Sequence, residues 1–127
     1  MRQETKKICQ AFIDGKTARA ARTHTDGEGL YLHGYEIAWF HHNDVDDIDR
    51  NILHVSFCGW PSSTTKERLN GLFDLLGFGR PFFTNKGTLY FGSKIRPVDS
   101  NEIMTFDLQL MRELTNDDAL NYHTIAA

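Results

Sequence analysis

Histidines carry much of the chemical capacity of this sequence, with six among 127 residues. Imidazole exchanges protons near neutral pH and coordinates transition metals, so histidines gathered on one surface can serve binding or catalysis. Several of them stand in alternating stretches that also hold an arginine, a tyrosine and a tryptophan. The candidate binding residues from these stretches are Arg22, His24, Tyr31, His33, His54 and Trp60.

A metal site is not predicted from these residues. Zinc sites use three or four ligands with short-range pairs such as HxxxH or CxxC, and the sequence contains neither spacing. Cys9 and Cys58 stand far apart and belong to no Cys-His cluster. Each is therefore expected to be a small buried hydrophobic residue outside any disulfide. No cofactor is predicted.

Catalysis would require the same histidines to converge with Arg22 and Ser56 as an anion-binding, acid–base set. The sequence has no nucleophile elbow, P-loop or paired-carboxylate signature. Thr23, Thr25 and Asp26 are explained by turn chemistry. We therefore predict a protein that is not an enzyme. A small-ligand or hydrolytic role of the histidine-bearing face is the third alternative.

Two kinds of macromolecular partner fit the residue pattern. Cations and aromatic rings are interleaved around residues 19–39, the combination that holds single-stranded nucleic acid, although a net charge of −3 opposes phosphate binding. Acidic residues gather at 43–50 and 99–118, which suits a basic protein surface. A protein partner is predicted first and nucleic acid second. Exposure of Trp60, Phe82 and Phe83 would favour protein, and a continuous basic stripe through Arg19, Arg22, Lys94 and Arg96 would favour nucleic acid.

A hairpin must position the first of these side chains. Asp26-Gly27 between short alternating runs predicts a type I′ turn, because both central positions need a positive φ. In that register Thr23 pairs with Leu30, and Ala21 with Leu32, on the inner face. The outer face then carries Arg22, His24, Tyr31 and His33.

Two helices are predicted to cover the sheet. The first runs from Thr5, its expected N-cap, to a stop at Gly15. The second has the stronger signal, because Thr64 and Glu67 fit a capping box and an apolar stripe follows as far as Gly77. That stripe consists of Leu69, Leu72, Phe73 and Leu76.

The remaining pattern completes a mostly antiparallel sheet. Strands are predicted at 36–40, 52–60 and 102–110, the last at an edge, and a hairpin at 80–91 turns around Asn85-Lys86-Gly87. Residues 41–50 have no apolar period, so the acidic stretch 43–50 is predicted to be a loop. Residues 112–127 are predicted to be a short helix or a flexible tail. The fold class is α+β, in a single domain over residues 1–127.

Composition agrees with a globular protein of the cytosol. The chain is 40% hydrophobic and 24% charged, as in ordinary soluble domains. No run approaches the roughly 18–20 apolar residues that a membrane span requires. The basic residues near the N-terminus have no apolar run behind them, so no signal peptide is predicted.

Two motifs resemble a pattern found in small proteins of tailed bacteriophages. The first is Thr23-x-Thr25-Asp26-Gly27-x-x-Leu30-x-Leu32-His33-Gly34-x-x-Ile37-Ala38. The second is Gly59-Trp60-x-Ser62-x-Thr64-Thr65-x-x-Arg68-Leu69-Asn70, and Arg80-Pro81-Phe82 is similar as well. The resemblance implies a phage protein made in the cytoplasm of the infected bacterium, and it assigns no site residue. We predict a non-enzymatic accessory protein that binds a bacterial or viral macromolecule, in host takeover or against host defence.

Overall fold

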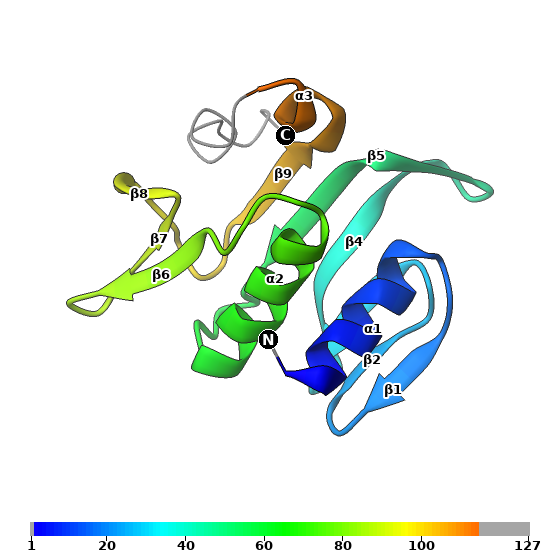
Figure 1. Ribbon diagram of the computed structural model, residues 1–127, viewed down its shortest axis with the longest axis horizontal. Coiled ribbons are helices and arrows are strands. Elements are labelled where there is room, and N and C mark those ends of the chain that lie inside the picture. The colour runs from blue at the N-terminus through cyan, green and yellow to red at the C-terminus, as the bar shows by residue number, and fades with distance from the viewer. Residues whose placement is uncertain (1, 115–127) are drawn as a thin grey trace.

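The computed structural model describes residues 2–114, which form three helices and nine strands (Figure 1). The helices are α1 (Gln3–Ile13), α2 (Ser63–Leu75) and α3 (Leu108–Glu113). The strands are β1 (Ala18–Ala20), β2 (Thr23–Thr25), β3 (Gly29–Leu32), β4 (Tyr35–Asp44), β5 (Asp47–Ser56), β6 (Phe82–Asn85), β7 (Thr88–Phe91), β8 (Ser93–Pro97) and β9 (Ile103–Asp107). Most of the predicted tail, from residue 115, lies outside the described residues.

The strands form two antiparallel sheets. The large sheet has the order β1-β2-β3-β4-β5-β9, and the small sheet has the order β6-β7-β8. The predicted α+β class and the edge position of β9 are confirmed. None of the three described helices has the length and apolar character that a bilayer crossing requires.

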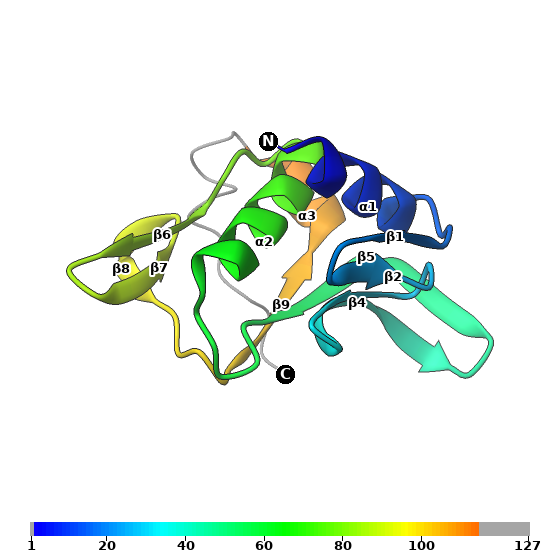
Figure 2. The same cartoon turned by 90° about the horizontal axis from the view of Figure 1, so that it is seen from below.

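Helices α1 and α2 lie together on one face of the large sheet, and the hydrophobic core fills the space between (Figure 2). Phe12 of α1 stacks on Phe40 of β4 with ring centroids 4.7 Å apart. Phe73 of α2 meets Phe106 of the large sheet and Phe91 of the small sheet at steep ring angles, the favourable arrangement for aromatic pairs. One helix therefore joins both sheets into a single core.

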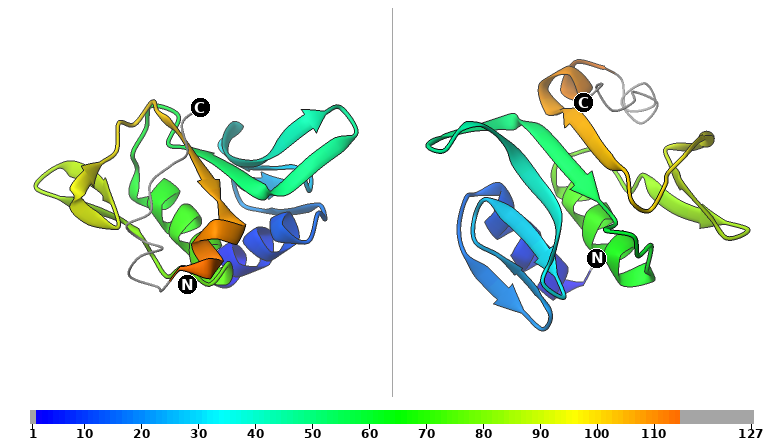
Figure 3. Two further views of the ribbon diagram at one scale, coloured as in Figure 1. Left: turned by 90° about the horizontal axis from the view of Figure 1, so that it is seen from above. Right: turned by 180° about the vertical axis from the view of Figure 1, so that it is seen from behind.

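The opposite face of the large sheet has no described helix in front of β3, β4 and β5 (Figure 3). We call it the outer face. Because neighbouring residues of a strand point to opposite sides, the buried hydrophobic residues of β5, Leu53 and Val55, face the helices. His54 between them points to the outer face.

The first hairpin has the predicted faces and a different register. Thr23 pairs with Leu32 rather than with Leu30. The carboxylate of Asp26 accepts hydrogen bonds from the amides two and three residues later, which closes a longer loop than a type I′ turn. Side chains alternate with a period of two, so this two-residue shift leaves Thr23 and Leu32 buried.

Arg22 is not the strand residue that was predicted. Ala20 pairs with Thr23, so Ala21 and Arg22 form the turn that joins β1 to β2. Ala21 has a φ of 51° in this turn. The pattern of apolar residues does not indicate a turn at this position. Arg22 is consequently exposed at the end of the hairpin, away from the middle of the outer face.

The prediction of an acidic loop at 43–50 is wrong. β4 continues through Asp44 and β5 begins at Asp47, so the two ten-residue strands meet at a turn over Val45 and Asp46. This part of the hairpin extends away from the helices (Figure 2), and residues 42–47 are all exposed. A strand exposed on both faces needs no apolar alternation, which is why the sequence pattern missed it.

The N-caps of α1 and α2 lie three and two residues before the predicted ones, and both helices end where predicted. Arg2 precedes α1 without a side-chain cap, and Thr5 lies buried within the helix. Ser62 caps α2 by accepting a hydrogen bond from the amide of Thr65, so the predicted capping box at Thr64 is wrong. Both stops are confirmed: Gly15 and Gly77 follow the C-caps with φ of 72° and 94°.

The hairpin at 80–91 is confirmed, with Lys86 and Gly87 at positive φ in its two-residue turn. A third strand, β8, was not predicted. Asn70 of α2 ties this small sheet to the helix, because its amide donates to the carbonyl of Phe82 at 2.8 Å and accepts from the amide of Phe82 at 2.8 Å.

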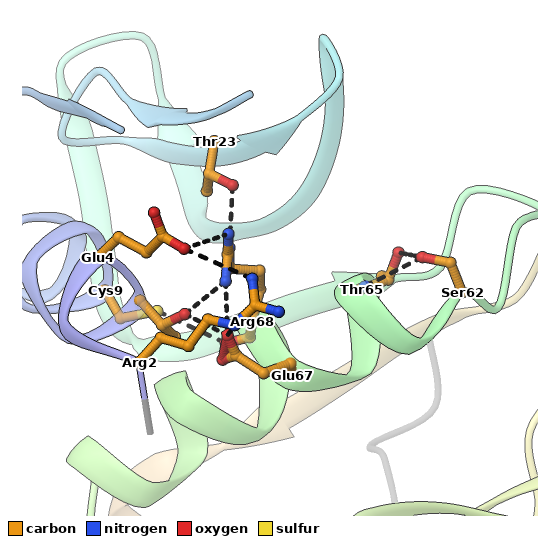
Figure 4. Close-up of polar contacts among 9 residues, drawn as sticks. Arg2, Glu4, Cys9, Thr23, Ser62, Thr65, Glu67 and Arg68 are labelled. Atoms are coloured by element: carbon orange, nitrogen blue, oxygen red, sulfur yellow. Dashed lines mark hydrogen bonds and ion pairs between the residues drawn. The ribbon is translucent and has the colours of Figure 1, made fainter. Parts of the chain in front are cut away.

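A buried arginine links both helices to the large sheet (Figure 4). Arg68 of α2 is 4% exposed. Its Nε donates to Thr23 Oγ1 of β2 at 2.9 Å, and its Nη1 donates to Thr5 Oγ1 of α1 and to Glu67 at 2.5 Å each. Thr5 also donates to Glu67, and Glu4 lies 3.8 Å from the guanidinium.

Glu67 is the predicted capping residue that takes another role. Because α2 begins at Ser63, Glu67 lies a turn further into the helix and faces α1. Its Oε1 accepts from Thr5 and Arg68, while its Oε2 is buried without a hydrogen-bond partner. Burying a carboxylate is unfavourable unless an opposite charge compensates it, and Arg68 supplies that charge.

Replacing Arg68 should therefore destabilise the whole fold. Arg68→Met keeps the apolar stem but leaves the Glu67 carboxylate without its compensating charge and the Thr23 hydroxyl without its donor. We expect the free energy of unfolding to fall by about 3 kcal/mol or more, measured by urea denaturation.

The matched control is Arg80→Met. Arg80 pairs with Asp74 at 3.5 Å on the surface, where ion pairs contribute less than about 1 kcal/mol. Adding Glu67→Gln to Arg68→Met should recover part of the loss. Equal small losses for both arginine variants would contradict the role given to Arg68.

Candidate binding surface

The six predicted site residues do not gather at one place. His24 stacks on Tyr31 across β2 and β3, with ring centroids 4.8 Å apart. His33 lies beside Trp60, at 5.5 Å. His54 lies beside other residues of β4, and Arg22 is in the turn before β2. The convergent histidine site that catalysis would need is therefore not formed by His24, His33 and His54.

The pair of His24 and Tyr31 belongs to the outer face. Burial, then hydrogen bonding to Glu36, raises the pKa of Tyr31 to about 12, and burial also raises the pKa of Glu36. Tyr31 therefore stays protonated at neutral pH and can donate to the Glu36 carboxylate. Both side chains cross over Gly29, where a Cβ would lie 2.3 Å from Glu36 Oε2. This group is held together by its own contacts.

His54 lies in the middle of the outer face. Trp39, its cross-strand partner, is half-buried and stacks on it at 5.5 Å. His41 Nδ1 is 3.0 Å from His54 Nε2, and Thr105 Oγ1 is 2.8 Å from His54 Nδ1. Burial and the neighbouring His41 lower the pKa of His54.

The pair of His33 and Trp60 lies where two tight turns meet. His33 and Gly34 join β3 to β4 with φ of 53° and 82°. Cys58 and Gly59 follow β5 with φ of 55° and 79°, and the amide of Trp60 closes that turn on the carbonyl of Phe57 at 2.9 Å. Each turn is followed by an exposed aromatic residue.

Those two aromatics, Tyr35 and Trp60, flank a small pocket. Tyr35 is 59% exposed and Trp60 is 54% exposed. The pocket between them measures about 100 Å³ and is lined by Leu32, Tyr35, Ile37, Phe57, Cys58, Trp60 and Thr65. We call it the Tyr35–Trp60 pocket. Its floor is the hydrophobic core itself, because Leu32, Ile37 and Phe57 are buried core residues.

Cys58 holds one wall of this pocket in place. Its thiol donates to the carbonyl of Glu36 at 3.1 Å, and its amide donates to Ser56 Oγ at 3.0 Å. The amide of Gly59 donates to the carbonyl of Ser100 at 2.7 Å. A positive φ is uncommon at a non-glycine residue, and these three hydrogen bonds hold Cys58 in that conformation.

A larger groove of about 590 Å³ runs between α2 and β6. Its polar side chains already bond to one another or to the backbone. Lys66 donates to Thr84 at 2.7 Å, Asn70 is bound to Phe82, and Arg80 faces Asp74. Phe82 is buried and Phe83 is half-buried, so of the three aromatic residues whose exposure would favour a protein partner only Trp60 is exposed.

The basic stripe that would favour nucleic acid is interrupted. Arg19 and Arg22 lie at the β1–β2 end of the molecule, whereas Lys94 and Arg96 lie on β8 at the other end (Figure 1). Arg96 donates to both carboxylate oxygens of Glu102, at 3.1 and 3.0 Å. Its charge is thereby neutralised within the fold.

A comparison with protein families gives the origin of the chain. The family model described as Kyanoviridae Gp96 protein matches residues 1–113. The chain belongs to the Kyanoviridae Gp96 family. The protein is thus a cyanophage protein, which agrees with the resemblance to tailed-phage proteins. No curated protein and no solved structure matches it.

Sequence reasoning missed three residues that matter in this Gp96-family protein. Tyr35 stood inside the first motif at an unspecified position. Its neighbour in the fold, Cys58, was expected to be buried and is half-buried. His41 was assigned to a loop. The dipeptides His33-Gly34 and Cys58-Gly59, each followed by an aromatic residue, are the one sequence signal that could have indicated the pocket.

The two thiols should react very differently with iodoacetamide. Cys9 is fully buried, and burial together with Glu67 raises the pKa of its thiol to about 12, so no reactive thiolate forms at pH 8. Cys58 lines the open pocket. We expect mass spectrometry to find one alkylated thiol, Cys58, in the native protein and two in urea.

A Cys58→Ser variant provides the control, since its native form should take up no label. Rapid labelling of Cys9 in the native protein would contradict the packing of α1 on α2.

Proposed function

We propose that this phage protein works inside the infected bacterium by binding another protein, of host or phage, at the Tyr35–Trp60 pocket, and that it is not an enzyme. The observation that carries the proposal is the pocket itself. An opening into the hydrophobic core is framed by two large aromatic side chains that are more than half exposed. Tyrosine and tryptophan beside a pocket are the residues that contribute most to protein interfaces.

The size of the pocket favours a side chain of a partner over a free ligand. Sites for drug-sized molecules and cofactors measure roughly 300–1,000 Å³. The Tyr35–Trp60 pocket measures about 100 Å³ and its floor is apolar. A single aliphatic side chain from a partner fits these properties, with the two aromatic rings packing around it.

The pocket is also formed in advance. The Cys58–Gly59 turn is held by hydrogen bonds to Ser56, Glu36 and Ser100. Trp60 lies directly between this turn and the capped start of α2. A partner therefore does not need to order the backbone on binding, which reduces the entropic cost of association.

The acidic hairpin is a separate surface. Tyr35 begins β4 and Asp44 ends it, so the tip lies roughly 30 Å away at about 3.3 Å per residue. Its exposed carboxylates suit a basic partner surface, and such a contact would speed association more than it would strengthen binding. The pocket remains the site expected to determine affinity.

Single-stranded nucleic acid is the second candidate, and the stacked rings of the outer face favour it. His24 with Tyr31 and Trp39 with His54 offer flat surfaces on which bases can stack. Against it stand the net charge of −3 and the separated cations. Protein binding is therefore the better-supported function.

Replacing Trp60 should abolish capture of the partner. The tagged protein is used to retrieve partners from lysate of infected host cells, with and without nuclease, and these are quantified by mass spectrometry. Trp60→Ala and Tyr35→Ala should each reduce recovery of a nuclease-resistant protein. Loss of an interface anchor costs about 2 kcal/mol or more, roughly 30-fold in Kd.

Ile95→Ala is the matched control, since Ile95 is 79% exposed on β8 and lies outside the pocket. It should capture the partner as wild type does. Loss of the captured partners after nuclease treatment would indicate that the protein binds nucleic acid instead. Equal recovery by Trp60→Ala and wild type would contradict the proposal.

A further inference from the structure

Two histidines of neighbouring strands face each other on the outer face. His41 is in β4 and His54 is in β5, and their nearest ring nitrogens are 3.0 Å apart. Both rings are half-buried. They lie 13 residues apart in the sequence, so the short ligand spacings used to recognise metal sites do not detect the pair.

A contact with Thr105 fixes the orientation of the His54 ring. Its Nδ1 lies 2.8 Å from the hydroxyl of Thr105, a buried residue of the neighbouring strand β9. A neutral His54 that donates from Nδ1 to this hydroxyl presents the lone pair of Nε2 to His41. An outer hydrogen bond of this kind holds metal-binding histidines in position in other proteins.

We propose that His41 and His54 bind a divalent transition-metal ion, with Cu²⁺ preferred, through Nδ1 of His41 and Nε2 of His54. Two nitrogens bound to one ion at about 2.0–2.1 Å lie roughly 2.9–3.4 Å apart. The observed separation of 3.0 Å falls in this range. The χ2 torsion of histidine is broad, so a modest turn of each ring directs both lone pairs to one point.

Metal binding at this pair requires no net gain or loss of protons. When His54 donates from Nδ1 to Thr105, its Nε2 accepts, and the proton of the His41–His54 hydrogen bond is on His41 Nδ1. Metal binding moves this proton to His41 Nε2, which is the other neutral form of the ring. Both imidazoles remain neutral, and the hydrogen bond between them is replaced by two metal–nitrogen bonds.

The site is open rather than closed. Within residues 2–114, no set of three or more His, Cys, Asp or Glu side chains is arranged to hold a metal. Water would occupy the remaining positions. With two imidazole ligands, Cu²⁺ should bind more tightly than Ni²⁺ or Zn²⁺, following the usual order for nitrogen ligands.

The fluorescence of Trp39 reports metal binding directly, because this ring stacks on His54 with centroids 5.5 Å apart. The chain has two tryptophans, so Trp60→Phe makes Trp39 the only one. CuCl₂ titrated into this variant should quench its fluorescence to saturation with one ion per chain, and EDTA should reverse it. Electron paramagnetic resonance of the copper-loaded wild type should show coordination by two nitrogens.

Variants in the same background separate this site from other copper-binding groups. His41→Ala and His54→Ala should each weaken binding at least tenfold, and Thr105→Val should weaken it about tenfold through the lost outer hydrogen bond. His42→Ala is the control, since His42 is the exposed neighbour of His41 on the same strand. Quenching unchanged in His41→Ala, or equally reduced in His42→Ala, would overturn the proposal, as would the absence of saturable quenching in the parent.

Discussion

The fold depends on one charge buried where three elements meet. Arg68 reaches from α2 to Thr5 of α1 and to Thr23 of β2, and it compensates Glu67 beside it. An apolar side chain at this position could hold the helices near the sheet, but it would allow them to slide. Hydrogen bonds from one rigid guanidinium to two elements fix a single arrangement. With α2 fixed in this way, the start of the helix, and Trp60 just before it, has a defined position.

Half of the specified positions of the second sequence motif have structural roles around this constraint. Ser62 caps α2, Leu69 is buried, Arg68 fixes the helix to α1 and β2, and Asn70 holds the small sheet through Phe82. Trp60 has no comparable structural task. More than half of its side chain is exposed, and it frames a pocket that opens into the core. The motif therefore combines residues that fix the backbone with one aromatic residue, Trp60, which we propose contacts a partner.

The sequence predicted those features that depend on local pattern. The α+β class, the two glycine stops, the hairpin at Lys86-Gly87 and the buried faces of β2 and β3 follow from periodicity and turn chemistry. It failed where side chains form contacts over long distances. Glu67 looked like a capping residue because its contacts with Thr5 and Arg68 depend on how α1 packs. The acidic hairpin lacked an apolar period because water surrounds it.

The site was harder to predict for the same reason. Residue types singled out His33, His54 and Trp60 as candidates, but only the fold shows that they belong to two different places. Tyr35 and Trp60 stand 25 residues apart in the chain, and two turns with positive φ bring them to one pocket. No pairwise spacing in the sequence indicates that meeting.

The claim that the Tyr35–Trp60 pocket contacts a protein partner can be tested most directly in the infected cell. A photoreactive benzoylphenylalanine is placed at position 35, or at position 95 as a control, and the cells are irradiated. We expect a covalent adduct with one defined protein from position 35 and none of that adduct from position 95. The same adducts from both positions, or adducts with nucleic acid alone, would contradict it.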